Sequence, residues 1–312
     1  MAKLVNELSW SRSRISMLRT CRRQYYYQYY LKWGGWGWDA DPLSQKAYFF
    51  TKMTNLPMLC GNAVHEAIKH VLEDLRDHGE LRLADPADHV RRDLLSKVWT
   101  DAEKELWRRS LKDHPPVFEL YYPGMKPDRD TLKNLGRKAA RCVENFLASE
   151  LYRDLRADDP DRWLAVDEGP SFDDASKLKL DGRTLWALPD FARRTADGTC
   201  EIWDWKTGRA NPNDEMQLLS YALNARDRWG FAPDRIRLFG FYLADDLVKE
   251  YPCDAERLAG MEDAIRADFE EMESLLADPA RNEPQEDLDR YFPRLDEEET
   301  CRSCLFKELC GY

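Results

Sequence analysis

The sequence predicts an α/β protein with a mixed sheet flanked by helices, and three observations carry this prediction. Apolar residues recur at helical spacing through much of the first half of the chain. From Trp163 onward the hydrophobic period changes to two, which is typical of strands, and helix signals return between and after these strands. An Asp-Gly pair at 197–198 stands between two apolar runs and predicts a β-hairpin.

The composition predicts a well-packed protein without a membrane segment. The 312 residues allow one large domain or two small ones, and 43% apolar content with 12% aromatic residues is ample for a core. No run of about 18 apolar residues occurs, and the N-terminus lacks the apolar part of a signal peptide. We therefore expect a soluble, cytoplasmic protein with no membrane partner. We expect one domain over 1–312, with parts at 1–60, 61–160, 161–255 and 256–312.

Charge and cysteine usage narrow the classes of partner and compartment. The net charge of -11 argues against general coating of nucleic acid, but a local basic groove remains compatible with it. The chain has eight cysteines and no signal peptide. Reduced thiols or metal ligands are therefore favoured over disulfides.

Residues 9–32 predict a helix capped by Ser9 or Ser11. Tyrosines alternate with basic residues here, a mixture that suits phosphate contacts and base stacking. An aromatic core face with a solvated basic face explains the same pattern equally well. The basic residues are Arg12, Arg14, Arg19, Arg22, Arg23 and Lys32.

Residues 33–57 predict a loop, because they hold three tryptophans among glycines, followed by Pro42 and Pro57. Helical spacing resumes at residue 61, and His65 flanks the apolar stripe of this helix. Taken alone, a histidine in this position is usually an ordinary structural residue. Further helices are predicted at 88–111 and 131–155, with a loop at 115–127.

The second half of the chain predicts strands with helices between them. A helix is predicted to start at 212–213 and to end at Gly230. Two acidic residues stand in its first turn, where the helix dipole favours negative charge. On this helix Gln217 and Tyr221 lie four residues apart and share a face. Strands are expected at 163–166, 177–180, 184–191, 201–206, 235–243 and 247–251, and a long acidic helix at 254–277.

The hairpin predicted around 197–198 brings two acids and an amine together. Side chains alternate faces along a strand, so Asp204 and Lys206 share one face. With a three-residue loop at 196–198, Asp190 falls opposite Asp204, whereas a two-residue loop would place it opposite Trp205 on the other face. We predict the three-residue loop or an equivalent bulge, because Gly198 stands where such a loop needs a left-handed residue.

Two converging carboxylates with an amine beside them predict a divalent metal site. Mg²⁺ and Mn²⁺ prefer oxygen ligands, and a cation relieves the repulsion between Asp190 and Asp204. The ion acidifies a water and neutralises charge on a phosphorane-like transition state, while Lys206 orients that water or stabilises that charge. A surface hairpin with an ordinary Asp-Lys pair is the alternative.

A second constellation is the cysteine set at the C-terminus. Cys301, Cys304 and Cys310 supply three thiolates within ten residues, a spacing that lets a short loop wrap one metal centre. A fourth ligand is needed, and Cys21 stands out because it lies among arginines beside an aromatic run. Spacing does not separate zinc from an iron–sulfur cluster, and three uncoordinated thiols are the alternative. The other cysteines fit small buried hydrophobic positions.

The order of these pieces resembles the RecB-like branch of the PD-(D/E)xK nucleases, and in particular its iron–sulfur members. These members include the Cas4 nucleases of CRISPR adaptation and the nuclease domain of AddB-type recombination proteins. The resemblance covers nearly the whole chain. Its motifs are Ser11-Arg12-Ser13…Cys21, Gly61 to His65, Glu168 or Asp167, Pro189-Asp190, Asp204-x-Lys206-Thr207-Gly208, Gln217-x3-Tyr221 and Cys301-x2-Cys304-x5-Cys310.

The resemblance implies a restriction-endonuclease-like core and a role for each matching residue. The metal would be held by His65, Asp190, Asp204 and the backbone carbonyl of Trp205. Lys206 would assist the attacking water, and Gln217 and Tyr221 would support the site; Glu168 completes the catalytic set. The cluster, a [4Fe–4S] centre, would be held by Cys21, Cys301, Cys304 and Cys310.

The activity implied is metal-dependent hydrolysis of DNA without a covalent intermediate. We expect action on single-stranded DNA or DNA ends, in CRISPR adaptation, recombination and repair, or phage defence, with a helicase or CRISPR integrase as possible partner. The DNA contacts expected are Arg12, Arg14, Arg22 and Arg23. The alternative is a non-catalytic iron–sulfur DNA-binding or scaffold subunit. The chain departs from the family in Arg22, where proline often follows the first cysteine, and in its long helical stretch at 66–155.

Overall fold

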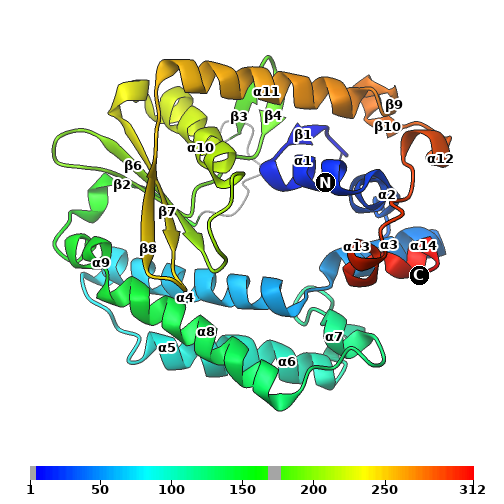
Figure 1. Ribbon diagram of the computed structural model, residues 1–312, viewed down its shortest axis with the longest axis horizontal. Coiled ribbons are helices and arrows are strands. Elements are labelled where there is room, and N and C mark those ends of the chain that lie inside the picture. The colour runs from blue at the N-terminus through cyan, green and yellow to red at the C-terminus, as the bar shows by residue number, and fades with distance from the viewer. Residues whose placement is uncertain (1–4, 168–176) are drawn as a thin grey trace. The chain divides into compact units, whose positions relative to one another are not determined.

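The computed structural model describes residues 5–167 and 177–312 (Figure 1). The chain divides into two compact units, each built from separate segments of sequence. The first unit contains Met1–Met53, Asp173–Trp186 and Glu262–Tyr312, and the second contains Thr54–Phe172 and Ala187–Met261. No helix within 5–167 or 177–312 has the length and apolar character needed to cross a lipid bilayer.

The second unit is built on a five-stranded mixed sheet. Its strand order is β2-β5-β6-β7-β8, and all neighbours are antiparallel except β6 and β7, which are parallel. This arrangement confirms the predicted α/β class with a mixed sheet. The strands are β2 (Trp163–Val166), β5 (Phe191–Arg194), β6 (Cys200–Lys206), β7 (Ile236–Tyr242) and β8 (Leu247–Tyr251).

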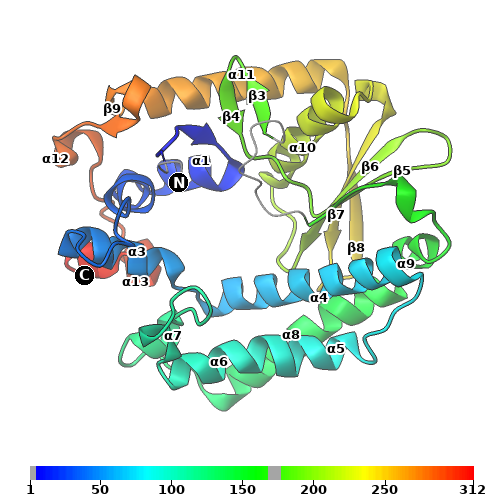
Figure 2. The same ribbon diagram turned by 180° about the vertical axis from the view of Figure 1, so that it is seen from behind.

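Helices cover both faces of this sheet (Figures 1 and 2). Helix α10 (Asp214–Trp229) connects β6 to β7 and packs on both strands. On the other face, α4 (Leu56–His78) and α8 (Arg129–Ala148) pack against each other. Trp203 and Trp205 of β6 join the apolar side chains of these two helices in one buried cluster. The alternation along β6 therefore leaves Asp204 and Lys206 on the α10 face.

The helical part of this unit begins earlier and is more divided than its spacing predicts. Helix α4 starts at Leu56 because the Asn55 side chain accepts the Met58 N–H, and Pro57 occupies the first turn, where no backbone donor is needed. The single helix predicted at 88–111 is divided into several helical pieces between 86 and 108, and the chain turns at Glu105, where φ is +51°. Its pieces are α5 (Pro86–His89), η2 (Val90–Leu95), α6 (Ser96–Glu103) and η3 (Leu106–Arg108).

The remaining helices of the second unit are short. The predicted helix at 131–155 is interrupted at Ser149, whose extended backbone ends α8 and whose side chain caps the next helix. These short helices are α7 (Phe118–Tyr121), α9 (Glu150–Leu155), η4 (Pro160–Arg162) and η6 (Pro233–Arg235).

In the first unit, the prediction of a single helix over 9–32 is wrong. Ser11 caps α1 (Arg12–Thr20) as expected, but Cys21 adopts an extended conformation, with φ -157° and ψ 113°, and breaks the helix. The chain then continues as α2 (Arg22–Tyr26) and a π-helical turn, η1 (Tyr27–Leu31). The predicted loop at 33–57 also contains a helix, α3 (Pro42–Lys52), capped by Asp41.

The strand predicted at 184–191 is two strands in two different sheets. In the first unit, β1 (Ser9–Trp10) pairs parallel with β4 (Arg183–Leu185), which pairs antiparallel with β3 (Leu178–Leu180). Strand β5 begins only at Phe191, and Pro189 lies in the break, where its missing N–H costs no ladder hydrogen bond. The later elements are α11 (Ala255–Glu273), β9 (Leu276–Asp278), η7 (Pro279–Arg281), β10 (Glu283–Pro284), α12 (Leu288–Tyr291), α13 (Glu298–Ser303) and α14 (Lys307–Cys310).

Candidate active site

The hairpin between β5 and β6 has the predicted three-residue loop. Phe191 pairs with Trp203 and Arg194 with Cys200, so the same register sets Asp190 opposite Asp204. The Thr195 N–H donates to the Thr199 carbonyl at 2.8 Å, which leaves 196–198 as the loop. Gly198 has φ +82°, the left-handed conformation that this loop needs. The register that brings the two carboxylates together is therefore confirmed.

The two carboxylates have different surroundings. Asp190 precedes β5, and its Oδ2 accepts the backbone N–H of Trp205 at 2.6 Å. Asp204 lies within β6 with 2% of its surface exposed. Burial, and next the negative charge of Asp190, raise the pKa of Asp204 to about 7, although the Lys206 ammonium opposes this rise.

His65 reaches the hairpin from α4. One ring nitrogen, Nε2, lies 3.0 Å from the Trp205 carbonyl oxygen, and the other, Nδ1, lies 3.4 Å from Asp190 Oδ1. Burial lowers the pKa of His65, but the carboxylates of Asp190, Asp204 and Asp167 outweigh this effect and raise it to about 9. A protonated imidazole therefore balances part of the negative charge in this structure.

Lys206 belongs to a ring of polar contacts with β6 and α10. Its Nζ lies 2.5 Å from Asp204 Oδ2 and donates to Gln217 Oε1 at 2.7 Å. Gln217 Nε2 donates to the Tyr221 hydroxyl at 2.5 Å, and that hydroxyl donates to Asp204 Oδ1 at 3.4 Å. Burial, and next Asp204, raise the pKa of Tyr221 well above its ordinary value, so it stays a neutral donor. The structure thus brings Gln217 and Tyr221 to the predicted site.

A third acid and a second lysine also lie beside the hairpin. Asp167 has φ +41°, its N–H donates to the Asp190 carbonyl at 2.7 Å, and burial and Asp190 raise the pKa of its carboxyl. Lys69 donates to the Asp167 carbonyl at 3.1 Å. The sequence pattern did not identify Lys69 as a site residue, although it stands four residues after His65 and so shares its helix face. Glu168, the expected catalytic acid, lies outside the described residues.

The donor chemistry of this cluster fits a hard divalent cation. The buried Asp204 carboxylate contacts the Lys206 ammonium through Oδ2, and oxygen ligands with a histidine are available around it. The predicted ligands do not yet converge, however. Across residues 5–167 and 177–312, no three His, Cys, Asp or Glu side chains are arranged to hold one ion. His65 instead contacts the Trp205 carbonyl, which is itself a predicted ligand.

The four predicted cluster cysteines surround one small, apolar-walled cavity in the first unit. Cys21 comes from the break between α1 and α2, and Cys301, Cys304 and Cys310 come from α13, α14 and the turn between them. Burial raises the pKa of the Cys304 thiol to about 11. The remaining cysteines lie outside this cavity, and three are buried, at 0–2% exposure: Cys60, Cys142 and Cys200.

The four arginines expected to contact DNA are placed differently from one another. Arg14 and Arg23 are buried, at 3% and 4% exposure. Arg14 donates to the Tyr25 hydroxyl, and Arg23 donates to the Phe292 carbonyl at 2.7 Å, so both side chains hold tertiary structure in the first unit. Arg22 pairs with Glu271 at 3.1 Å and stays partly exposed. DNA contact by these arginines, and by Arg12, stays a prediction.

Comparison with protein families identifies the family of this chain. The family model described as the PD-(D/E)XK nuclease superfamily matches residues 9–311, which is nearly the whole chain. The match spans the hairpin, the helix that carries Gln217 and the C-terminal cysteines. Comparison with curated proteins finds no match.

Proposed function

Because the chain belongs to the PD-(D/E)XK nuclease superfamily, we propose that it is a deoxyribonuclease whose reaction takes place at the β5–β6 hairpin. Members of this superfamily are metal-dependent nucleases, generally with Mg²⁺ or Mn²⁺. The observation that carries the proposal is the register of this hairpin, which sets Asp190 opposite Asp204 and leaves Lys206 on the same face. A degenerate site would tolerate the loss of at least one of these three residues.

The residues that would hold the metal are His65, Asp190, Asp204 and the Trp205 carbonyl. When bound, Mg²⁺ or Mn²⁺ supplies an acidified water and neutralises charge that develops on the phosphate. The metal would take over the charge balance that His65 and Lys206 provide in this structure. His65 would lose its proton to become a ligand, since a metal needs the neutral imidazole.

Lys206 would act on the water and the phosphate. Gln217 Oε1 holds the Lys206 ammonium at 2.7 Å, and Asp204 lies on its other side, so the amine is fixed before substrate arrives. A fixed ammonium can orient the attacking water and stabilise negative charge in the transition state without reorganisation. Tyr221 and Gln217 would act as positioning residues for Lys206 and Asp204.

The cysteine cavity would hold a [4Fe–4S] cluster through Cys21, Cys301, Cys304 and Cys310. The support is that four thiols from both ends of the chain line one cavity. In such a cluster each thiolate binds a different iron, so the four sulfurs surround the centre and need not meet at one point. A single zinc ion would need them to converge. The cluster would join the two chain ends.

We extend the proposal to single-stranded DNA or DNA ends as substrate and to the cytoplasm as compartment. CRISPR adaptation, recombination and repair, and phage defence are the contexts that the family resemblance implies, with a helicase or integrase as partner. Exonuclease and endonuclease action both fit the proposed chemistry.

Lys206→Ala tests the proposed function. Cleavage of a labelled single-stranded oligonucleotide with Mg²⁺ or Mn²⁺ should fall by about 10²–10³-fold, the usual effect of removing one preorganised charge-stabilising group. Lys97→Ala, an exposed lysine on α6 that pairs with Asp101, is the matched control and should keep full activity. Circular dichroism and the melting temperature establish that both variants fold.

Gln217→Met provides a second arm, because it removes the acceptor that holds Lys206 and keeps the lysine itself. It should lower kcat, and full activity of both Lys206→Ala and Gln217→Met would refute the assignment. If the unmodified protein binds DNA and cleaves neither single- nor double-stranded DNA with either metal, the non-catalytic subunit is the correct description.

A further inference from the structure

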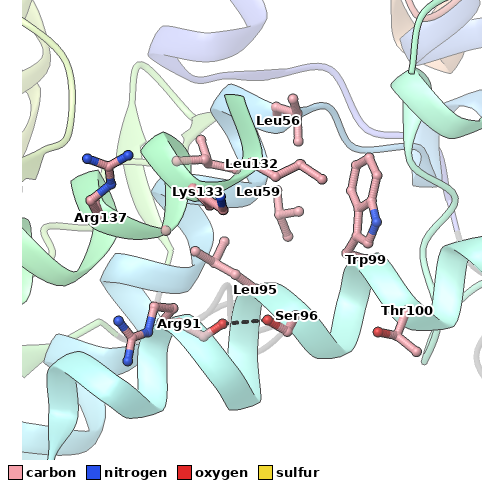
Figure 3. Close-up of a pocket in the computed structure, with 12 residues that line it drawn as sticks. Leu56, Leu59, Arg91, Leu95, Ser96, Trp99, Thr100, Leu132, Lys133 and Arg137 are labelled. Atoms are coloured by element: carbon pink, nitrogen blue, oxygen red, sulfur yellow. Dashed lines mark hydrogen bonds between the residues drawn. The ribbon is translucent and has the colours of Figure 1, made fainter. Parts of the chain in front are cut away.

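A cavity of about 550 Å³ lies in the helical part of the second unit, on residues that take no part in the hairpin site. It is formed between the start of α4, the continuous run of η2 and α6, and the first half of α8 (Figure 3). Its volume is within the range of sites that bind small molecules, about 300–1,000 Å³. Leu59 of this cavity and His65 are six residues apart on α4, which corresponds to about 9 Å along the helix axis.

One end of the cavity is apolar and aromatic. Trp99 of α6 stands at this end, and leucines from three elements line the space between it and the opposite end (Figure 3). The Trp99 ring is partly exposed and has no stacking partner among the aromatic side chains that the structure describes. A free indole face at the wall of a cavity can stack on a flat ring such as a nucleobase. The leucines are Leu56, Leu59, Leu95, Leu132 and Leu135.

The opposite end is cationic. Arg91 and Arg137 lie there, and Lys133 lines the same cavity, whereas no carboxylate is among the lining residues (Figure 3). Three cations and no acid among the lining residues form a local positive patch in a chain of net charge -11. They match the charge of a phosphate group better than a single carboxylate does.

The three cations are free to meet an anion or held only weakly. Arg137 has no ion pair or hydrogen bond with any residue that the structure describes. Lys133 lies 3.5 Å from Asp130, with its side chain 66% exposed, and Arg91 pairs with Asp88 while half exposed. Exposed pairs of this kind contribute about 0–1 kcal/mol, so a phosphate can compete with them.

We propose that this cavity binds a nucleotide, with the base against Trp99 and the phosphate at Arg91, Lys133 and Arg137. The inference rests on the proposed function only in its choice of nucleotide, the repeating unit of a nuclease substrate. The nucleotide is either a free nucleoside monophosphate or one unit of a single-stranded chain. A fatty acid could pack on the leucines, but its single carboxylate would leave two cations unpaired and it has no ring to stack on the indole face.

The test measures binding without metal, so that no cleavage occurs. The protein in EDTA is titrated with dAMP and, separately, with a ten-residue oligodeoxyadenylate, and heat is followed by calorimetry. Arg137→Glu should weaken at least one of the two by about tenfold or more, as expected when an attractive charge becomes repulsive. Arg141→Glu, a charge reversal one turn later on α8 and outside the cavity, is the matched control and should change neither affinity more than about twofold.

The aromatic end is tested with Trp99→Ala, which should weaken binding by about tenfold, and Trp99→Phe, which should restore most of it because a ring remains to stack on. Arg137→Glu should also reduce the salt dependence of oligonucleotide affinity, with the slope of log K against log salt falling by about 0.7. A change in slope is not expected from a purely structural effect.

Each outcome assigns the source or overturns the proposal. An Arg137-dependent affinity for dAMP assigns the site to free nucleotides, and dependence seen only with the oligonucleotide assigns it to a strand. The proposal is overturned if neither probe responds to Arg137→Glu or Trp99→Ala, or if only myristate binds in an Arg137-dependent way. Lys206→Ala should leave this binding intact, so that failure here is distinguishable from failure of the proposed hydrolysis.

Discussion

The acidic hairpin and the cysteine cavity are both predicted metal centres, but the chain builds them in opposite ways. Asp190, Asp204 and Lys206 come from one hairpin, whose loop length and Gly198 set their alignment. The cysteine cavity joins Cys21, near one end of the chain, to Cys310 at the other. The first site is fixed by local backbone pairing, and the second by tertiary packing of distant segments.

The two sites also differ in how they balance charge without a metal. In the hairpin, His65 and Lys206 supply positive charge beside the carboxylates. In the cysteine cavity, burial raises the pKa of Cys304 and Cys310, so these two thiols stay protonated and neutral. Loss of the metal should therefore abolish activity at the hairpin with little unfolding, whereas loss of a cluster should lower the stability of the first unit.

The largest expected effect on stability is at the cysteine cavity. Purified protein should contain iron and absorb broadly at about 400 nm, and Cys304→Ser should remove this absorbance. Because the cluster would join distant parts of the chain, its loss should cost about 4 kcal/mol and lower Tm by about 10 °C. Calorimetry and metal analysis measure both effects.

Cys253→Ser is the matched control, since this thiol lies outside the cavity, and it should keep the absorbance and nearly the same Tm. Lys206→Ala should also retain the cluster. A colourless protein that contains zinc would contradict the cluster, and an unchanged Tm in Cys304→Ser would remove the contrast between the two sites.

The next largest expected effect is a gain in stability when Asp204 is replaced, because its buried carboxylate destabilises the folded protein at neutral and high pH. The pKa of Asp204 is about 7 in the folded protein and about 3.9 in an unfolded chain, a difference that corresponds to about 4 kcal/mol at most. Below about pH 4 the carboxyl is protonated in both states and contributes no cost. The cost grows between these two pKa values and is complete above about pH 7, because the folded protein then holds a buried charge.

Asp204→Asn removes this cost, although it also leaves Lys206 without its carboxylate. In EDTA the variant should melt at a higher temperature than the unmodified protein at pH 8, and the gap should shrink as the pH approaches 4. Asp154→Asn, on the exposed face of α9, should show no such trend. A variant that is less stable at every pH would show that Asp204 supports the fold and is not held there for a metal.

The smallest effect is at the turn of the hairpin. Gly198 has φ +82°, and a Cβ added there would lie 3.7 Å from Arg235 Nη2, so space is available and only the backbone conformation is strained. Gly198→Ala should cost about 1 kcal/mol, and Gly198→Asn should cost less because Asn tolerates this conformation. Denaturant unfolding measures the difference.

Cleavage by these two variants reports whether the register survives. Both should keep most of the activity, because the pairing of Phe191 with Trp203 maintains the alignment. Loss of activity in Gly198→Ala, with the stability nearly unchanged, would mean that the strand can slip, since a shift by one residue moves Asp190 to the other face.

The sequence predicted the features of the fold and of the site that depend on residues close together in the chain. The change of hydrophobic period located the strands, the Asp-Gly pair located the hairpin, and the position of Gly198 favoured the loop length that sets Asp190 opposite Asp204. The Ser11 cap and the end of α10 at Gly230 also follow from nearest neighbours in the chain. Such features depend on backbone hydrogen bonds over a few residues, which the residue types specify directly.

Tertiary packing decided the features that cross long distances. It broke the helix at Cys21, split 184–191 between two sheets and buried Arg14 and Arg23 in contacts that a basic, tyrosine-rich helix does not reveal. Periodicity tells which residues share a face of an element, and does not tell which element covers that face. The cavity lined by Trp99 and Arg137 therefore emerged only when the helices were placed in space. The four cysteines were expected together from the family resemblance, but only the tertiary structure brings them to one cavity.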